Sequence, residues 1–518
     1  MHVHEFALTG LILNLLLLFL LFNVADAQNI VKSLPGYPGA LPFKLETGYV
    51  GVGENDSVQL FYYFIESERD VSMDPLVLWL TGGPGCSAFS GLVYEIGMLS
   101  AFSGLVSKID LRNGQDLWKT DKIEKLLRLL DITAATSLNV GPFSFDDERY
   151  NGSLPSLHAN PYAWTKIASI ILLDLPVGTG FSYATTSQGY FSSDTKSTKD
   201  AYLFLQKWLL NHPRFMKNRL YIAGDSYAGK IVPMVVLEIS NGGNEAGLKP
   251  RMSVEGYMVG NPLTDSRKDE NWKVPYAHRL GLISDEYYER AKSSCNGEYI
   301  NPSPNNTECL FALHLIQECI SGIYPANILE PKCQHLASRE GLQWDQDYLE
   351  EDSIDILLPS SDQEKPKCRD DTYVLSRVWM NDPTVQEALQ IREGTKEQWR
   401  RCNRSISYDM DVASVFDYHQ VLIRKGYQAL IYSGDHDMMV PYLGTLQWIR
   451  DLNLTVEDDW RPWFVNGQIA GYTLNYQFNE DVCCFTFATV MGAGHTAPEY
   501  KPKECFAMID RWFTNYPL

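Results

Sequence analysis

The chain has 518 residues, which is long enough for one large α/β domain with an insertion or for two or three small domains. Hydrophobic residues make up 45% and aromatic residues 12%, a composition that predicts a substantial buried core and excludes a largely disordered chain. The formal net charge of −20 argues against a nucleic-acid partner. No proline-rich or glycine-serine linker divides the sequence, which favours a single domain.

The N-terminal segment has the form of a leader sequence. An apolar run at residues 11–22 precedes Ala25-Asp26-Ala27, and a small-residue site after such a run is typical of signal-peptide cleavage. The alternative, a membrane anchor, is disfavoured because the run is short for a bilayer. We therefore expect residues 1–27 to be a signal peptide, residues 28–518 to form the mature domain, and the protein to have no stable membrane anchor.

Two further features fit transit through the secretory pathway. The 10 cysteines indicate disulfides rather than a metal site, because the sequence has no CxxC pair and no histidine-rich cluster. Sequons for N-glycosylation occur at Asn55, Asn151, Asn305, Asn403 and Asn453. We expect an extracellular or vacuolar protein that holds no metal.

A glycine-rich turn follows the second of two predicted strands, at residues 60–64 and 76–80. The turn, TGGPGCS at residues 81–87, can bring bare backbone NH groups close to a ligand, as an oxyanion hole requires. The alternatives are an ordinary tight turn or a phosphate loop. A phosphate loop is disfavoured because no Gly-Lys-Ser/Thr ending follows.

A candidate nucleophile lies in LYIAGDSYAGKIV at residues 220–232. Residues 220–223 are typical of the end of a buried strand, Gly224 permits a sharp turn, and a helix begins at Ala228, so Ser226 would lie at the tip of the turn. The second glycine of the usual Gly-x-Ser-x-Gly pattern is replaced by Ala228, and an ordinary strand-to-helix loop is the alternative. With a strand at 170–173 and a helix at 200–210, the pattern predicts a mostly parallel sheet.

Later strands supply a candidate acid and a candidate base. A strand ends near residues 258–262, and residues 265–383 change to helices and loops with five cysteines, which predicts a cap insertion over the site. Strands at 430–433 and 485–490 then lead to Asp437 and His495. The order Ser, Asp, His is that of the α/β hydrolases, with histidine as base and aspartate as its orienting partner. Asp435 is the alternative acid.

Several stretches together resemble the serine carboxypeptidase family. They are WLTGGPGCSAFSGLVYEIG at residues 79–97, GDSYAGK at 224–230, GDHDMMVP at 434–441 and GAGHTAPEYKP at 492–502. With LPGYPGALPFKLETGYVGVG near the start, the likeness covers nearly the whole mature chain.

The resemblance implies an α/β-hydrolase fold with a mostly parallel central sheet and a helical cap stapled by disulfides. It implies a triad of Ser226, Asp437 and His495, with Gly83 and Tyr227 as donors of the oxyanion hole. It implies no cofactor. The implied disulfides are Cys86–Cys402, Cys295–Cys309 and Cys333–Cys368.

Two residues depart from the peptidase pattern of that family. Its peptidases usually have Asn where Thr81 stands and Glu where Asp225 stands, and these hold the substrate's terminal carboxylate together with a second Glu, here Glu95. Asp is shorter than Glu by about 1.5 Å, and a Thr hydroxyl replaces an amide with two donors. Trp79 joins this predicted substrate-binding set.

The altered pair resembles the plant serine carboxypeptidase-like acyltransferases. That resemblance implies transfer of an acyl group from a 1-O-glucose ester to a small-molecule acceptor in secondary metabolism. The alternative is a carboxypeptidase acting on a peptide C-terminus, which Ala228 favours because the family's peptidases often have Ala there. A catalytically impaired binding protein is the third hypothesis.

The third hypothesis depends on an atypical segment at residues 98–140. SAFSGLV at residues 87–93 recurs at 100–106, and the family pattern that stops at Gly97 resumes only at Gly141-Pro142. The segment is either a genuine insertion, which could displace the clamp beside Glu95, or an error in the gene model.

Overall fold

The computed structural model describes residues 30–95, 142–145, 150, 152–332, 369–396, 398–479 and 482–518. The predictions for the signal peptide at 1–27, the segment at 98–140, the sequon at Asn151 and the Cys333–Cys368 pair lie outside these residues.

A 12-stranded sheet forms the centre of the described chain. Its strands are β1 (Ile30–Val31), β2 (Leu45–Val52), β3 (Val58–Ile65), β4 (Leu76–Leu80), β7 (Ser169–Leu173), β8 (Tyr183–Ala184), β10 (Leu220–Asp225), β11 (Val254–Gly260), β13 (Gln428–Gly434), β14 (Thr455–Val465), β15 (Gln468–Asn479) and β16 (Val482–Val490). Their spatial order is β1-β2-β3-β7-β4-β10-β11-β13-β16-β15-β14, and β8 pairs with β3. Strands β7 to β16 in this order run parallel, and both flanks are antiparallel. The predicted α/β-hydrolase class with a parallel centre is confirmed.

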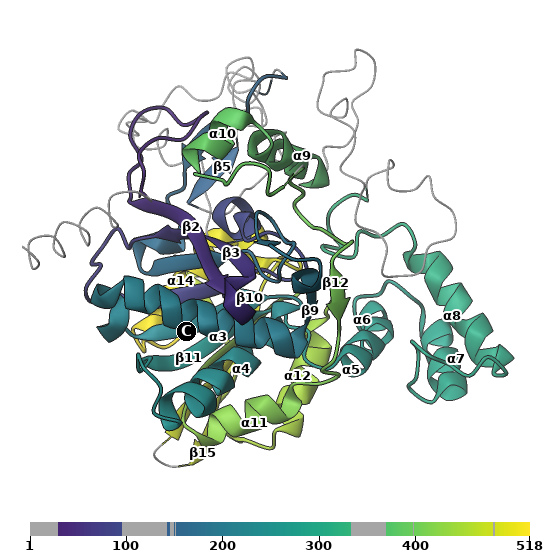
Figure 1. The fold of residues 1–518 in the computed structure, drawn as a ribbon. Helices are drawn as coiled ribbons and strands as arrows, with labels where there is room; N and C mark the ends of the chain where they lie inside the picture. The colour runs from purple at the N-terminus through teal and green to yellow at the C-terminus, as the bar shows by residue number, and fades with distance from the viewer. Residues whose placement is uncertain are drawn as a thin grey trace, which may run out of the picture.

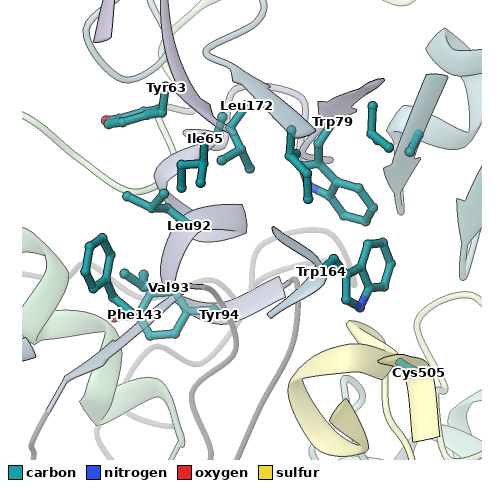
Figure 2. Packing of buried hydrophobic residues seen from close by; sticks show 14 of the residues in the cluster. Tyr63, Ile65, Trp79, Leu92, Val93, Tyr94, Phe143, Trp164, Leu172 and Cys505 are labelled. Atoms are coloured by element: carbon teal, nitrogen blue, oxygen red, sulfur yellow. The ribbon is translucent and has the colours of Figure 1, made fainter. Parts of the chain in front are cut away.

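The parallel strands are apolar on both faces. In β4, Val77 and Trp79 belong to one buried cluster, while Leu76, Leu78 and Leu80 belong to the cluster on the opposite face. Such a strand has no solvent face, because helices cover the sheet on both sides. Figure 2 shows part of the first cluster, including the indole of Trp79 near that of Trp164.

Helices cover the two faces of the sheet. The α-helices are α3 (Asp194–Asn211), α4 (Ala228–Leu237), α5 (Ser266–Asn271), α6 (Lys273–Arg279), α7 (Asp285–Cys295), α8 (Thr307–Ile320), α9 (Arg369–Met380), α10 (Pro383–Ala388), α11 (Phe416–Arg424), α12 (Tyr442–Asp451), α13 (Ala497–Tyr500) and α14 (Pro502–Phe513). Shorter 3-10 and π segments are η1 (Glu54–Asp56), η2 (Gly91–Glu95), η4 (Trp164–Lys166), η5 (Gln188–Tyr190), η6 (Pro213–Lys217) and η7 (Glu238–Glu245). Two small sheets pair β5 (Phe143–Phe145) with β6 (Leu157–Ala159) and β9 (Phe191–Ser193) with β12 (Ser407–Asp409).

The predicted cap region is helical in the part that the structure describes. Helices α5 to α8 follow β11, and Figure 1 shows α7 and α8 side by side at the right edge of the molecule. The Cys295–Cys309 disulfide joins the last residue of α7 to the first turn of α8. The small core of this region includes Met438 and Leu443, which lie after β13, so the helices are packed onto the loop that carries Asp437.

The long hairpin of β14 and β15 is among the elements that were not predicted. Its turn is Asn466-Gly467, and both residues have positive φ, 51° and 78°. An Asn-Gly pair with that backbone is the strongest short hairpin signal, because the primed turns it forms match the twist of the strands. The turn residues alone therefore indicate the hairpin. The strand pattern does not, because the polar residues of β14 interrupt the alternation of apolar and polar side chains.

Candidate active site

Ser226 lies at the turn between β10 and α4, as the sequence predicts. Its φ is +54°, a left-handed conformation that non-glycine residues rarely adopt and that lifts the side chain off the sheet. A Cβ on Gly224 would lie 2.8 Å from the Ala228 Cβ. Because Gly224 has no side chain, the Ala228 methyl group has room beside it. The second glycine of the Gly-x-Ser-x-Gly pattern is therefore not needed here.

The structure brings Ser226, His495 and Asp437 together from three separate loops. His495 Nε2 lies 2.8 Å from Ser226 Oγ, and His495 Nδ1 lies 2.8 Å from Asp437 Oδ2. These contacts give a base within reach of the hydroxyl proton and a carboxylate that fixes the imidazole tautomer. All three residues follow strands of the parallel centre, β10, β13 and β16, whose carboxyl ends meet at one edge of the sheet.

Asp437 is fully buried and receives several hydrogen bonds. The Asn261 side-chain amide donates to its Oδ2 at 2.8 Å, and the Met439 backbone NH donates to its Oδ1 at 2.7 Å. The alternative acid, Asp435, instead accepts from the Gly492 backbone NH at 2.7 Å and contacts His436 at 2.6 Å. The geometry therefore favours Asp437 as the partner of His495, and His436 is a local turn residue.

Sequence reasoning missed a backbone segment that joins the cap to the triad loops. The Met438 NH donates to the Pro325 carbonyl at 2.9 Å, and the His495 NH donates to the Ala326 carbonyl at 2.7 Å. A Cβ on Gly494 would lie 2.2 Å from that Ala326 oxygen, so the approach requires glycine. The cap thus fixes the loops that carry Asp437 and His495.

Gly83 and Tyr227 have the backbone groups that an oxyanion hole needs. Among the residues that the structure describes, neither backbone NH donates to an acceptor. The Tyr227 NH also lies at the N-terminus of α4, where the helix dipole favours negative charge. Gly82 packs directly under the nucleophile, since a Cβ there would lie 2.6 Å from the Ser226 Cβ.

The glycine-rich loop is held from two sides. The Cys86–Cys402 disulfide joins it to a distant segment, where the Ser87 NH also donates to the Arg401 carbonyl at 2.7 Å. Buried Asp174 accepts from the Ser87 hydroxyl at 2.7 Å and from the Ala88 NH at 2.8 Å. Asp174 was missed from the sequence, although a polar residue at the end of the 170–173 strand was a usable signal.

The four residues predicted to bind substrate form two hydrogen-bonded groups, in which Trp79, Glu95 and Asp225 are buried and Thr81 is half-buried. Glu95 Oε2 accepts from the Trp79 indole at 3.0 Å and from the Thr81 hydroxyl at 2.8 Å, while Asp225 Oδ1 accepts from the Gly82 NH at 3.1 Å. Trp79 is fully buried, so it positions Glu95 rather than contacting a substrate. Figure 2 shows Leu92, Val93 and Tyr94, whose packing fixes the end of η2 that carries Glu95.

The electrostatics of these acids and of the base are linked. Burial raises the pKa of Asp225 to about 6, and the charge of His495 opposes the rise. Burial, and next the charge of Asp225, raise the pKa of Glu95 well above its ordinary value. Burial works to lower the pKa of His495, but Asp437 and Asp225 outweigh it, so that pKa is raised. Two neighbouring acids that resist losing both protons are a place where a proton can be held.

The described residues show neither a metal-binding cluster nor a membrane-spanning helix. The described residues contain no cluster of three His, Cys, Asp or Glu side chains able to hold a metal ion, and no described helix is long and apolar enough to cross a bilayer.

The asparagines of the described sequons differ in their exposure to solvent. Asn55, Asn305 and Asn453 are exposed. Asn403 is half-buried, and its amide donates to the Gly178 carbonyl at 2.9 Å.

The sheet order, the elbow at Ser226 and the contacts of His495 define a protein of the α/β-hydrolase class with a serine at its nucleophile elbow. Residues 35–114 and 132–515 match the peptidase S10 family, described as serine carboxypeptidase. The chain belongs to this family and is an enzyme of the serine carboxypeptidase type. The resemblance found in the motifs is confirmed.

Curated relatives match over nearly the full length. The chain is 43% identical to serine carboxypeptidase-like 17 of Arabidopsis thaliana over 507 residues, with 98% of each chain covered. It is 45% identical to serine carboxypeptidase-like 1 of the same plant over 511 residues, covering 99% of this chain and 98% of the relative. Among solved structures, Kex1(delta)p, a prohormone-processing carboxypeptidase of Saccharomyces cerevisiae, has a TM-score of 0.64 at 18% identity, covering 94% of this chain and 96% of its own. That likeness supports the fold.

Proposed function

We propose that the protein is an acyltransferase that works through an acyl-enzyme on Ser226, with His495 as base and Asp437 as its orienting acid. Ser226 attacks the carbonyl carbon of a 1-O-acyl glucose ester, and His495 takes the serine proton and returns it to the departing glucose. A small-molecule alcohol then attacks the acyl-enzyme, His495 takes its proton, and Ser226 leaves as the hydroxyl. The NH groups of Gly83 and Tyr227 would stabilise the oxyanion in both steps.

The observation that carries this proposal is the hydrogen bonding of Thr81 and Asp225. Thr81 donates its one hydroxyl proton to Glu95, and Asp225 accepts from the Gly82 NH. Thr81 therefore has no proton left for a substrate carboxylate, and no described hydrogen bond joins Asp225 to Glu95. A site of this kind suits the hydroxyl groups of a neutral sugar ester better than the charged end of a peptide.

A carboxypeptidase is the second candidate, and the raised pKa values of the two acids favour it. A carboxyl group that remains protonated at mildly acid pH can donate a hydrogen bond to a substrate carboxylate. The Asp225 pKa of about 6 makes this possible, and the Glu95 pKa is raised as well. Ala228 also favours a carboxypeptidase, because the peptidases of the family often have Ala at this position.

A product assay on the unchanged protein and on a double variant distinguishes the acyltransferase from the carboxypeptidase. Purified protein is given a panel of 1-O-acyl glucose esters with alcohol acceptors and, separately, blocked dipeptides. We expect transfer to outpace amino-acid release, and we expect Thr81→Asn with Asp225→Glu to shift the ratio toward release. Efficient trimming by the unchanged protein without transfer would contradict the acyltransferase proposal. Ser226→Ala is the control and should abolish both reactions.

The same proposal places the protein in the secretory pathway, outside the cell or in the vacuole. Support comes from the leader-like residues 1–27, from the two disulfides and from the exposed sequon asparagines. Disulfides persist in oxidising compartments. The impaired-binding hypothesis is the weakest, because the triad contacts of His495 are complete.

A further inference from the structure

A cavity of about 460 Å³ lies against the hairpin of β14 and β15, and its lining includes none of Ser226, Asp437 and His495. Helix α12 forms its other wall, and Arg279 of α6 lies at its edge. The proposed reaction does not use this cavity. Its lining includes Asn453, the asparagine of a sequon completed by Thr455.

The walls combine aromatic surface with free polar groups. Trp460 is 42% exposed, and its other side is stacked on Tyr472 with ring centres 5.5 Å apart, so the ring is held in place. Arg279 and Arg450 line the cavity with exposed side chains, and the charge of Arg450 acts on the neighbouring Tyr476, while no hydrogen bond to another described side chain holds either guanidinium. Exposed aromatic surface beside unpaired donors is typical of a binding site. Pyranose sugars match it, since they have an apolar face of C–H groups and an edge of hydroxyl groups.

Asn453 is well placed to carry such a ligand. It lies in the turn between α12 and β14 with φ +54°, and its exposed side chain makes no described hydrogen bond. Asn403 differs, because its amide donates to the Gly178 carbonyl. A sugar attached to Asn453 would start on the cavity wall, and tethering gives it a high local concentration there.

We propose that this cavity is the docking site of an N-linked oligosaccharide on Asn453, whose first sugars pack on Trp460. The inference rests on the proposed entry into the secretory pathway. There a lipid-diphosphate-linked oligosaccharide is the donor: Asn453 Nδ2 forms the bond to the anomeric carbon and loses one proton, and the lipid diphosphate leaves with the electrons of the broken C–O bond. The docked glycan covers apolar surface of Trp460 and Val456 that is otherwise open to water.

The test is site-resolved glycan release from the full chain secreted by a eukaryotic host. Mass spectrometry of glycopeptides gives occupancy, and a peptide N-glycosidase then acts on native and denatured protein. We expect the Asn453 glycan to leave the native protein at least about tenfold more slowly than the Asn305 glycan, which corresponds to about 1.4 kcal/mol of docking. After denaturation the two rates should be equal.

Matched variants identify the cavity as the cause. Trp460→Ala should bring the Asn453 release rate to that of Asn305, and Arg450→Ala, on the facing helix, should move it in the same direction. Phe464→Ala is the control, because Phe464 is 47% exposed on the same strand and does not line the cavity. It should leave the slow release unchanged.

The contradicting outcomes are distinct. An Asn453 glycan released as fast as that on Asn305, or Asn453 unoccupied while Asn55 and Asn305 carry glycans, would overturn the docking proposal alone. Slow release that survives both Trp460→Ala and Arg450→Ala would do the same. Absence of glycans at every sequon would overturn the secretory assignment and the docking site with it. Acyl transfer is not part of the readout, so a failure of the proposed chemistry is seen separately.

Discussion

The Asn261 side-chain amide donates a 2.8 Å hydrogen bond to Asp437 Oδ2, the same oxygen that lies 2.8 Å from His495 Nδ1. The Asn261 side-chain oxygen Oδ1 in turn accepts from the Gly434 NH at 3.1 Å. Asn261 thus fixes both the loop and the rotamer of the acid. Its φ of +44° suits Asn, which tolerates the left-handed region.

We expect Asn261→Ala to lower kcat by about ten- to a hundredfold, because a hydrogen bond to a charged group is worth about 1.5–3 kcal/mol. KM should change little, since Asn261 is fully buried and does not face substrate. Steady-state kinetics on the folded fraction measures both. Asn218→Ala is the matched control, because it also removes a buried amide, one that binds the Asp74 carbonyl at 2.8 Å. Equal kcat in the two variants would contradict the positioning role.

The two aspartates after β13 give opposite expectations. Asp437→Asn should lower kcat by about 10⁴-fold, because the amide favours the wrong imidazole tautomer. Asp435→Asn should cost no more than about tenfold, since it weakens only loop hydrogen bonds. Kinetics with one acyl ester compares them directly. A larger loss in Asp435→Asn would show that the acid had been assigned to the wrong residue.

The acid limb of the activity profile depends on Asp225. His495 must be neutral to accept the serine proton, so activity rises with pH through its folded pKa. The negative charge of Asp225 helps to raise the His495 pKa, so Asp225→Asn should move the acid limb of kcat/KM to lower pH. Asp200→Asn, at a buried aspartate paired with Lys196, is the control and should leave the limb in place. A shift to higher pH would refute the coupling.

Asp225 should also cost stability at neutral pH. Its folded pKa of about 6 lies above the ordinary 3.8, so the native state holds the proton more tightly than the unfolded chain, and stability falls as pH rises between these values. Asp225→Asn should therefore raise the free energy of unfolding at pH 7 by on the order of 1–3 kcal/mol and have little effect near pH 4. Thermal unfolding at both pH values measures the difference. A variant less stable at pH 7 would contradict the burial argument.

The two described disulfides should differ in effect. Replacing Cys86 and Cys402 by Ala frees the glycine-rich loop that carries Gly83, so kcat should fall together with stability. Replacing Cys295 and Cys309 by Ala loosens only α7 and α8, so stability should fall while kcat stays within about twofold; each loss of stability should be about 2–5 kcal/mol. Unfolding curves and kinetics are measured on both. An unchanged kcat without the first disulfide would show that Asp174 alone holds the loop.

Local pattern was sufficient for residues that carry their own signature. Ser226, Asp437 and His495 each follow an apolar strand at a glycine-containing turn, and the family resemblance implied the partners in the two described disulfides. Asn261 also follows a strand, but beside Pro262 it looked like a strand end. Asp174 also stands at the end of a predicted strand, but its role was missed because its partner Ser87 lies 87 positions away. The Asn466-Gly467 pair in the hairpin of β14 and β15 was a local turn signal that the sequence prediction did not use.

The sequence by itself determined which polar groups lie at the active edge, because parallel strands present their carboxyl ends together and each turn residue follows its own strand. Only the tertiary structure decided which aspartate faces His495. It also decided how far the pKa values of Glu95 and Asp225 are raised. Those outcomes depend on burial and on hydrogen bonds from Asn261, Gly82 and Trp79, which belong to separate elements. Electrostatics in a buried site depends on distance and desolvation, and the order of residues along the chain specifies neither.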